Sequence, residues 1–140
     1  MHTPLTDLAT LRGVLPKVAA AWVMELQLEL LEAHPGEVVM TLPVAPKQVH
    51  GGGVLCGQAM MAAADTSMIL AIVTRLGEFK PMTTVQLQTS FLRPIAGDSG
   101  AARVVARVLR LGRKLAFGEI EIFDARGELA AHSTTTYTLL

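Results

Sequence analysis

The segment from Gly51 to Leu76 reads GGGVLCGQAMMAAADTSMILAIVTRL, and the remaining chain is interpreted from it outward. A glycine loop opens the segment, and residues 58–76 contain neither Pro nor Gly. This composition predicts a helix of about five turns. Arg75 in the last turn and Gly77 just after it are typical of a helix end. Apolar residues occur on every face, which predicts a helix enclosed by protein.

One ionisable residue, Asp65, lies in the middle of this apolar helix. Burying a carboxylate is costly unless it has partners or a function, so Asp65 is the first candidate for a catalytic residue. Residues 54–73 also have the length of a membrane span. They contain Asp65 and Gln58, however, and the rest of the chain has the pattern of strands. We therefore expect burial inside a sheet or an oligomer, and no membrane partner.

Length and composition limit the possible functions. The 140 residues fit a single domain spanning 1–140. A net charge of zero and a pI near 6.9 give no sign of a nucleic-acid partner, although the mean hydropathy of +0.43 is high. The lone Cys56 excludes an internal disulfide and fits a reducing cytoplasm. The chain starts without a basic stretch, so we expect no secretory signal and a cytoplasmic protein.

The part before the glycine loop predicts a helical segment and a hairpin. Residues 1–22 form the N-terminal helical segment, in which Thr6 or Asp7 caps a helix that Pro16 ends. Apolar and polar residues then alternate in Met24–Leu30 and again in Val38–Val44. This alternation is typical of half-buried strands. Because a Pro-Gly turn at residues 35–36 separates them, the pair is predicted to be a hairpin.

Four further strands are predicted after the helix. The turns between them are too short for the crossover connections that parallel strands need, so we expect an antiparallel meander. The chain is thus predicted to be α+β, with an antiparallel sheet of about six strands wrapped around one long central helix. The four segments are Thr83–Leu92, Ala101–Leu111, Leu115–Phe123 and Glu128–Leu139.

Five short motifs occur in this order: CGQAMMAAADT (56–66), TTVQLQTSFLRP (83–94), GD (97–98), LGRKLAFGEIEI (111–122) and TTTYTL (134–139). Over residues 24–139 the chain resembles the hotdog-fold acyl-CoA thioesterases of the PaaI-like type. The resemblance implies a hotdog fold and hydrolysis of an acyl-CoA thioester. It also implies a homotetramer built from dimers whose sheets join edge to edge, and no cofactor beyond the CoA of the substrate.

The chain departs from the family's helix motif, which is His-Gly-Gly with the catalytic acid eight residues after the first Gly. A literal HGG stands at residues 50–52, but Asp65 lies fourteen residues past its first Gly. The spacing fits if Gly57 is the motif glycine, with Cys56 in the His place and Gln58 in the second Gly place. His50 then falls where relatives often carry an Asn that contacts the thioester carbonyl. Participation of Cys56 or His50 in the site stays open.

The chemistry of thioester hydrolysis supports the same residues. It needs a base for water and donors for the developing oxyanion. A helix N-terminus offers free N–H groups, so the amides of Gly57 and Gln58 suit the oxyanion. Asp65 lies about 12 Å further along the axis at ~1.5 Å per residue, too far to act on the same carbonyl. Two antiparallel helices across a twofold axis can bring Gly57 of one chain to Asp65 of the other, where Asp65 acts as general base or nucleophile. We therefore expect the monomer to be inactive.

Further residues are assigned to the substrate and to water. Thr84 matches a Ser or Thr that positions the water in relatives, and the alternative is an ordinary polar position on the sheet. Met60, Met61 and Met68 suggest an adaptable pocket for an aryl or medium-chain acyl group. A set of basic residues at strand ends suits the phosphates of CoA, with ordinary solvated charge as the alternative. These are Arg93, Arg110, Arg113 and Lys114.

Other functions remain possible at this level. The four histidines show no spacing typical of metal ligands, so no metal site is expected. A non-catalytic acyl-CoA or lipid-binding protein of the same fold is the main alternative. A hydratase needs an Asp and a His in one local segment, and Asp65 with His50 has the wrong order and spacing. A purely structural oligomer would bind no CoA ester.

Overall fold

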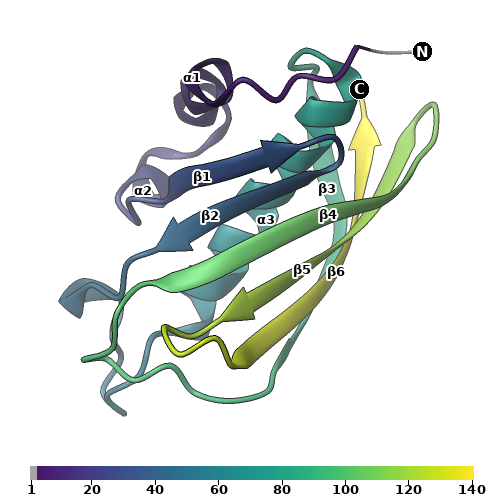
Figure 1. The fold of residues 1–140 in the computed structure, drawn as a ribbon. Coiled ribbons are helices and arrows are strands. Elements are labelled where there is room, and N and C mark those ends of the chain that lie inside the picture. The colour runs from purple at the N-terminus through teal and green to yellow at the C-terminus, as the bar shows by residue number, and fades with distance from the viewer. Residues whose placement is uncertain (1–2) are drawn as a thin grey trace.

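The computed structural model describes residues 3–140 and shows a curved antiparallel sheet folded around one helix (Figure 1). Two short helices precede the sheet, α1 (Leu8–Val18) and α2 (Ala21–Met24). The hairpin β1 (Glu29–His34) and β2 (Glu37–Leu42) follows, then the 3-10 turn η1 (Pro46–Gln48) and the long helix α3 (Gly57–Leu76). The remaining strands are β3 (Met82–Phe91), β4 (Ala102–Leu111), β5 (Leu115–Phe123) and β6 (Leu129–Leu139).

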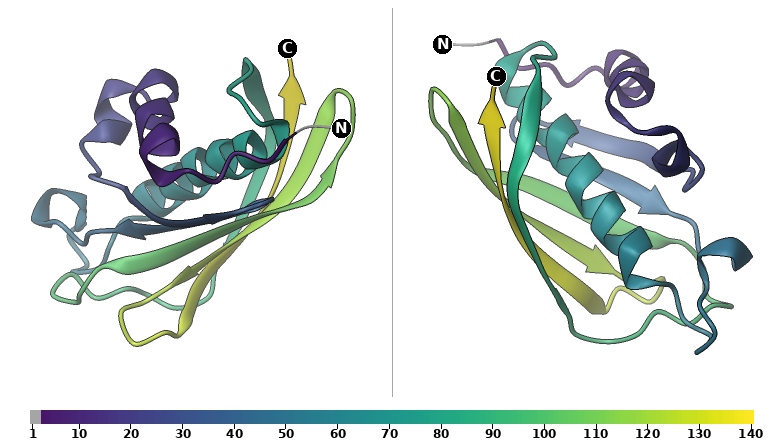
Figure 2. Two further views of the ribbon diagram at one scale, coloured as in Figure 1. Left: turned by 45° about the horizontal axis from the view of Figure 1, so that its top comes forward. Right: turned by 180° about the vertical axis from the view of Figure 1, so that it is seen from behind.

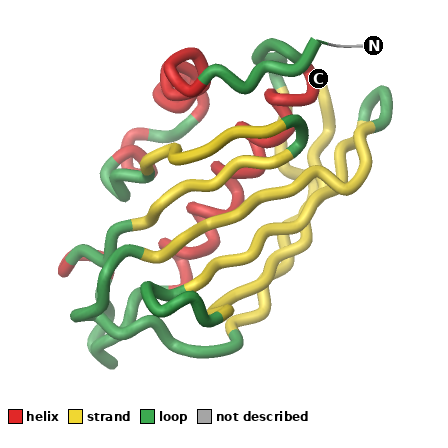
Figure 3. Tube along the Cα trace, viewed as in Figure 1, coloured by secondary structure: helices red, strands yellow, loops and turns green. Residues whose placement is uncertain are grey.

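The sheet has the order β1-β2-β4-β5-β6-β3, and all neighbouring strands are antiparallel. Seen from behind, α3 lies against the concave face of this sheet (Figure 2). The tube view shows the same arrangement, with a single long helix lying behind the hairpin and the middle of the sheet (Figure 3). This confirms the predicted hotdog architecture. It leaves β1 and β3 as the two edge strands.

Helix α3 is the centre of the core. Its 20 residues are long and apolar enough to cross a membrane, but 78% of the most apolar window is buried inside the protein. The helix is therefore the buried core helix of the domain, as its composition predicts. Gly77, at φ 83°, ends the helix in the left-handed conformation. Met68 contacts the sheet closely because Gly118 opposite has no side chain, and a Cβ there would lie 2.2 Å from the Met68 methyl.

The N-terminal segment belongs to the same core. Asp7 caps α1 by accepting a hydrogen bond from the Thr10 amide at 2.9 Å, as predicted. The helix does not end at Pro16 but continues to Val18. A proline has a helical φ and costs one backbone hydrogen bond, and the burial of Leu11, Val14 and Leu15 offsets that loss.

Two predictions about the strands are wrong in part. The segment 24–30 is not one strand, because α2 extends to Met24 and Gln27 takes a positive φ of 57° before β1 starts at Glu29. The four strands after α3 are not a simple meander, because β3 pairs with β6 rather than with β4. The connection over residues 92–101 is long enough to pass beneath the ends of the sheet (Figure 1).

A β-bulge changes which residues of β3 face the helix. The pairing of β3 with β6 shifts register between Thr84 and Gln86. Alternation alone places Val85 on the same face as Leu87, but Val85 is 60% exposed. The extra residue turns Thr84 inward, toward α3, where it is half-buried.

Candidate active site

Asp65 lies in the middle of α3, where two hydroxyl groups hold its carboxylate. Thr84 of β3 donates to Asp65 Oδ1 at 2.8 Å, and Tyr137 of β6 donates to the same oxygen at 2.5 Å. The Tyr137 hydroxyl also lies 2.8 Å from the main-chain oxygen of Asp65. Within residues 3–140, Asp65 Oδ2 accepts no hydrogen bond. Thr84, which was predicted to position the water, contacts the candidate catalytic carboxylate directly, and its effect on a water molecule stays a prediction.

The electrostatics of the pair favour a protonated tyrosine. Tyr137 is 1% exposed, and this burial raises its pKa far above the ordinary value of 10. The negative charge of Asp65 and the hydrogen bond to it raise the pKa of Tyr137 further. The raised pKa keeps the phenol protonated near neutral pH, where it donates a hydrogen bond to Asp65.

The N-terminus of α3 is the second component of the site. Gly57 is its first residue, and the N-cap Cys56 makes no side-chain hydrogen bond to the helix. The first amides of the helix thus remain free for a ligand. Phe91, at the end of β3, covers Gly57, and a Cβ on Gly57 would lie 3.0 Å from the Phe91 Cζ atom.

A cavity of about 370 Å³ opens at this helix N-terminus. His50 lines it, and its Nδ1 atom accepts a hydrogen bond from the Gly52 amide at 2.8 Å. That bond leaves Nε2 to carry the proton, so the ring has a donor available at the cavity. The cavity is otherwise mostly apolar, and its further lining residues are Val54, Leu55, Gly57, Met60, Phe91, Leu92, Arg93 and Pro94.

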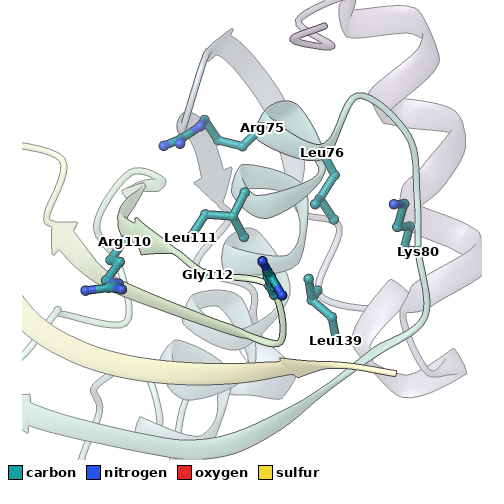
Figure 4. Close-up of a pocket in the computed structure, with 8 residues that line it drawn as sticks. Arg75, Leu76, Lys80, Arg110, Leu111, Gly112 and Leu139 are labelled. Carbon is teal, nitrogen blue, oxygen red and sulfur yellow. The ribbon is translucent and has the colours of Figure 1, made fainter. Parts of the chain in front are cut away.

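The structure separates the predicted basic residues into two groups. Arg93 lies at the cavity near Gly57 and pairs with Glu128 at 3.3 Å. Arg110, Arg113 and Lys114 lie at the β4–β5 turn, near the opposite end of α3. A pocket of about 720 Å³ joins two of them to Arg75 and Lys80 (Figure 4).

Three other residues predicted to bind substrate, Gln58, Met61 and Met68, do not line the cavity beside Gly57. Gln58 is exposed at the second position of α3, and Met61 is half-buried. Met68 is 1% exposed and lies in the core against Gly118. Of the methionines in α3, Met60 lines the cavity beside Gly57. Substrate contacts of Gln58, Met61 and Met68 stay predictions.

Several functional candidates were missed at the sequence level. Tyr137 had a recognisable signal, because Ser133, Thr135 and Tyr137 alternate toward the buried face of β6, and a buried tyrosine hydroxyl needs a partner. Arg75 and Lys80 had none, because they join the β4–β5 turn only in the folded chain.

Sequence comparison identifies relatives of this chain. Residues 52–131 match the family model of the thioesterase superfamily. A Thermoplasma volcanium protein named as a candidate esterase is 32% identical over 114 residues, which cover 81% of this chain and 84% of that protein.

Structural comparison gives the same family. A thioesterase from Haemophilus influenzae superposes with a TM-score of 0.85 at 26% identity, covering 100% of this chain and 95% of that one. PaaI from the phenylacetic acid degradation operon of Escherichia coli has the same fold, with a TM-score of 0.79 at 20% identity over 96% of each chain. So does a hypothetical thioesterase of Streptococcus pneumoniae solved with coenzyme A, with a TM-score of 0.78 at 18% identity over 96% of this chain and 97% of that one.

Proposed function

Because this chain belongs to the thioesterase superfamily, we propose that it hydrolyses an acyl-CoA thioester at a site shared between two subunits. Asp65 of one subunit is the general base or nucleophile, and the Gly57 amide of the other subunit binds the oxyanion. The observation that carries this proposal is that both residues of α3 lie against the edge strand β3, whose outer side pairs with no strand within residues 3–140.

Asp65 and Gly57 lie near opposite ends of β3. Thr84, near its start, holds Asp65, and Phe91, its last residue, contacts Gly57. The two positions are seven residues apart on an edge strand. Antiparallel pairing of β3 with a second copy that sets Thr84 opposite Phe91 would bring each Asp65 to the partner's Gly57. Within one chain, eight helical residues separate Asp65 from Gly57 by about 12 Å.

The reaction then follows from the groups present. The free Oδ2 of Asp65 takes a proton from water as the water oxygen bonds to the thioester carbon. The negative charge that develops on the carbonyl oxygen is stabilised by the uncapped amides at Gly57 and by the donor Nε2 of His50. Collapse breaks the carbon–sulfur bond, and the CoA thiolate takes the proton from Asp65. In the nucleophilic alternative, Asp65 Oδ2 bonds to the thioester carbon as the carbon–sulfur bond breaks and CoA leaves as the thiolate. Water then opens the resulting anhydride, which releases the acid, restores the Asp65 carboxylate and supplies the proton that the thiolate takes up. Neither route needs a metal or a cofactor.

The basic pocket at the far end of α3 suits the phosphates of CoA. Arg75, Lys80, Arg110 and Arg113 come from three segments and line the same pocket. Figure 4 labels the first three. Within the part of the chain that the structure describes, none of the four has a carboxylate partner, whereas Arg93 does. Asp65 and Arg75 are separated by ten helical residues, about 15 Å. The phosphates would then bind the subunit that supplies Asp65, and the S. pneumoniae structure with coenzyme A supports this ligand class.

The cavity beside Gly57 suits the acyl group. Its volume of about 370 Å³ is at the small end of the range for ligand pockets. Phe91, Met60 and Leu92 make its walls apolar, which favours an aryl or medium-chain acyl group over a charged one. We further propose that the active form is a dimer or tetramer and that it works in the cytoplasm.

The test is a panel of acyl-CoA substrates assayed by release of free thiol, with wild type and Asp65→Asn compared. We expect wild-type turnover to be highest for aryl or medium-chain esters, and the variant to lose at least about 100-fold in kcat. The variant should still bind acyl-CoA, because the phosphate pocket and the cavity are unchanged. Wild-type kcat in Asp65→Asn would exclude Asp65 as the catalytic carboxylate and refute the proposal.

A further inference from the structure

We propose that Tyr137 is a positioning residue, which selects the oxygen of Asp65 that acts on water. This inference rests on the proposed function and concerns a residue that neither the sequence motif nor the family match assigns. It gives a reason for the buried tyrosine of β6, because the neighbouring buried positions Ser133 and Thr135 on the same face carry small side chains.

The bulge in β3 brings both hydroxyls to one carboxylate. Thr84 and Tyr137 are direct cross-strand partners in the β3–β6 pairing. The register shift after Thr84 turns its side chain inward, beside that of Tyr137. Both donate to Oδ1 of Asp65, from two different strands. Two hydroxyls converging on one oxygen leave Oδ2 as the oxygen with free lone pairs.

The hydroxyl of Tyr137 has one proton and two acceptors within reach. These are Asp65 Oδ1 at 2.5 Å and the Asp65 main-chain oxygen at 2.8 Å. Hydrogen bonds to a charged acceptor are shorter and stronger, so the Tyr137 hydroxyl donates its proton to Asp65 Oδ1 rather than to the main-chain oxygen. The second contact fixes the position of the hydroxyl against the backbone of α3. Tyr137 therefore fixes the carboxylate relative to the helix that carries it.

A fixed orientation of the Asp65 carboxylate has a consequence for catalysis. The terminal torsion of an Asp side chain is broad and roughly twofold, so packing alone does not distinguish its two oxygens. Productive proton transfer needs a water within hydrogen-bond distance of one defined oxygen. With Tyr137 and Thr84 both on Oδ1, Oδ2 is the oxygen that faces the water. Tyr137 itself is 1% exposed, so it does not contact substrate.

The first test is Tyr137→Phe, with Ser133→Ala as the matched control. Ser133 is buried on the same face of the same strand, and its hydroxyl lies 2.7 Å from that of Thr89 rather than at Asp65. We expect Tyr137→Phe to lower kcat roughly 10-fold to 100-fold, the loss typical of one hydrogen bond to a charged group, with KM unchanged. Ser133→Ala should keep the wild-type kcat. Wild-type kcat in Tyr137→Phe, or an equal loss in Ser133→Ala, would overturn the assignment.

The second test does not depend on activity. Tyr137 is the single tyrosine of the chain, so the ultraviolet absorbance of tyrosinate reports on this residue alone. The neighbouring Asp65 charge raises the pKa of Tyr137, so Asp65→Asn should lower it. An identical alkaline titration in wild type and Asp65→Asn would contradict the pairing. If Asp65→Asn is inactive but Tyr137→Phe is fully active, the proposed function stands and only this inference fails.

Discussion

Replacing Gly57 by Ala separates its proposed role in catalysis from a purely structural one. The added Cβ would lie 3.0 Å from Phe91 Cζ and 3.3 Å from Phe91 Cε1, so the ring must move by a few tenths of an ångström. Phe91 lies at a strand end and is 49% exposed in the single chain, so its ring can shift by this amount without disturbing the core. A displaced rotamer costs about 0.5–1.5 kcal/mol, and Ala in place of Gly in a helix returns up to about 1 kcal/mol.

The free energy of unfolding should therefore change by no more than about 1 kcal/mol, a Tm shift of roughly 3–5 °C in either direction. Activity should change far more, because the methyl group occupies the space through which the carbonyl approaches the amide. We expect a loss of about 100-fold to 1000-fold in kcat, comparable to removal of an oxyanion donor. Thiol release from an acyl-CoA and thermal unfolding followed by circular dichroism measure the two effects.

Two matched variants make the result interpretable. In Gly57→Ala/Phe91→Leu the smaller side chain removes the clash, so the Tm should return to that of Phe91→Leu while kcat stays about 100-fold or more below that of Phe91→Leu. Gly13→Ala changes another helical glycine, with no atom within 4 Å of the new Cβ, and should leave kcat unchanged. Recovery of kcat in the double variant to the value of Phe91→Leu would refute the reasoning, because Gly57 would then serve only to accommodate Phe91.

Three further predictions follow from the phosphate pocket, Tyr137 and the β3 edge. Arg110→Glu should raise the KM for acyl-CoA at least about 10-fold, since reversing one charge removes an ion pair with a phosphate and adds repulsion. The KM for an acyl-pantetheine, which lacks the phosphates, should not change. Equal effects on both substrates would exclude this pocket as the phosphate site. Because the pKa of Tyr137 is raised in the folded protein, the unfolded chain loses the phenol proton at lower pH, from about pH 10 upward. The free energy of unfolding should therefore fall as the pH rises above about 10, by up to about 1.4 kcal/mol per pH unit. Urea unfolding at about pH 9 and about pH 11 measures this, and Tyr137→Phe should show a smaller decrease than wild type; equal decreases would contradict it. Val85→Lys places a charge on the exposed bulge of β3 and should give a folded, inactive monomer in sedimentation velocity, whereas an active monomer would exclude the shared site.

The sequence was most informative where one local pattern determined one element. The Pro-free and Gly-free run to Leu76 predicted α3 to within one residue of its start at Gly57. The turns at residues 112–113 and 125–127 similarly located β5 and β6, which were predicted at residues 115–123 and 128–139. The motif spacing selected Asp65 and Gly57, because both lie on the same helix.

Features that depend on tertiary structure were not accessible in the same way. Pairing of β3 with β6 is decided by how the sheet curls around α3, and the connection of residues 92–101 allows either neighbour. The bulge at Val85 hides the inward direction of Thr84 from any argument based on alternation. Arg75 and Arg110 lie 35 positions apart and share a pocket only once α3 packs on the sheet.

The central claim is that Gly57 and Asp65 of different subunits form one site, and mixing two inactive variants tests it most directly. Gly57→Ala and Asp65→Asn are unfolded together, refolded as a mixture and assayed by thiol release. Random pairing makes about half of the dimers mixed, and each mixed dimer has one of its two sites intact, so about one quarter of wild-type activity should return. A mixture as inactive as its two components would show that each site lies within a single chain and would contradict the account.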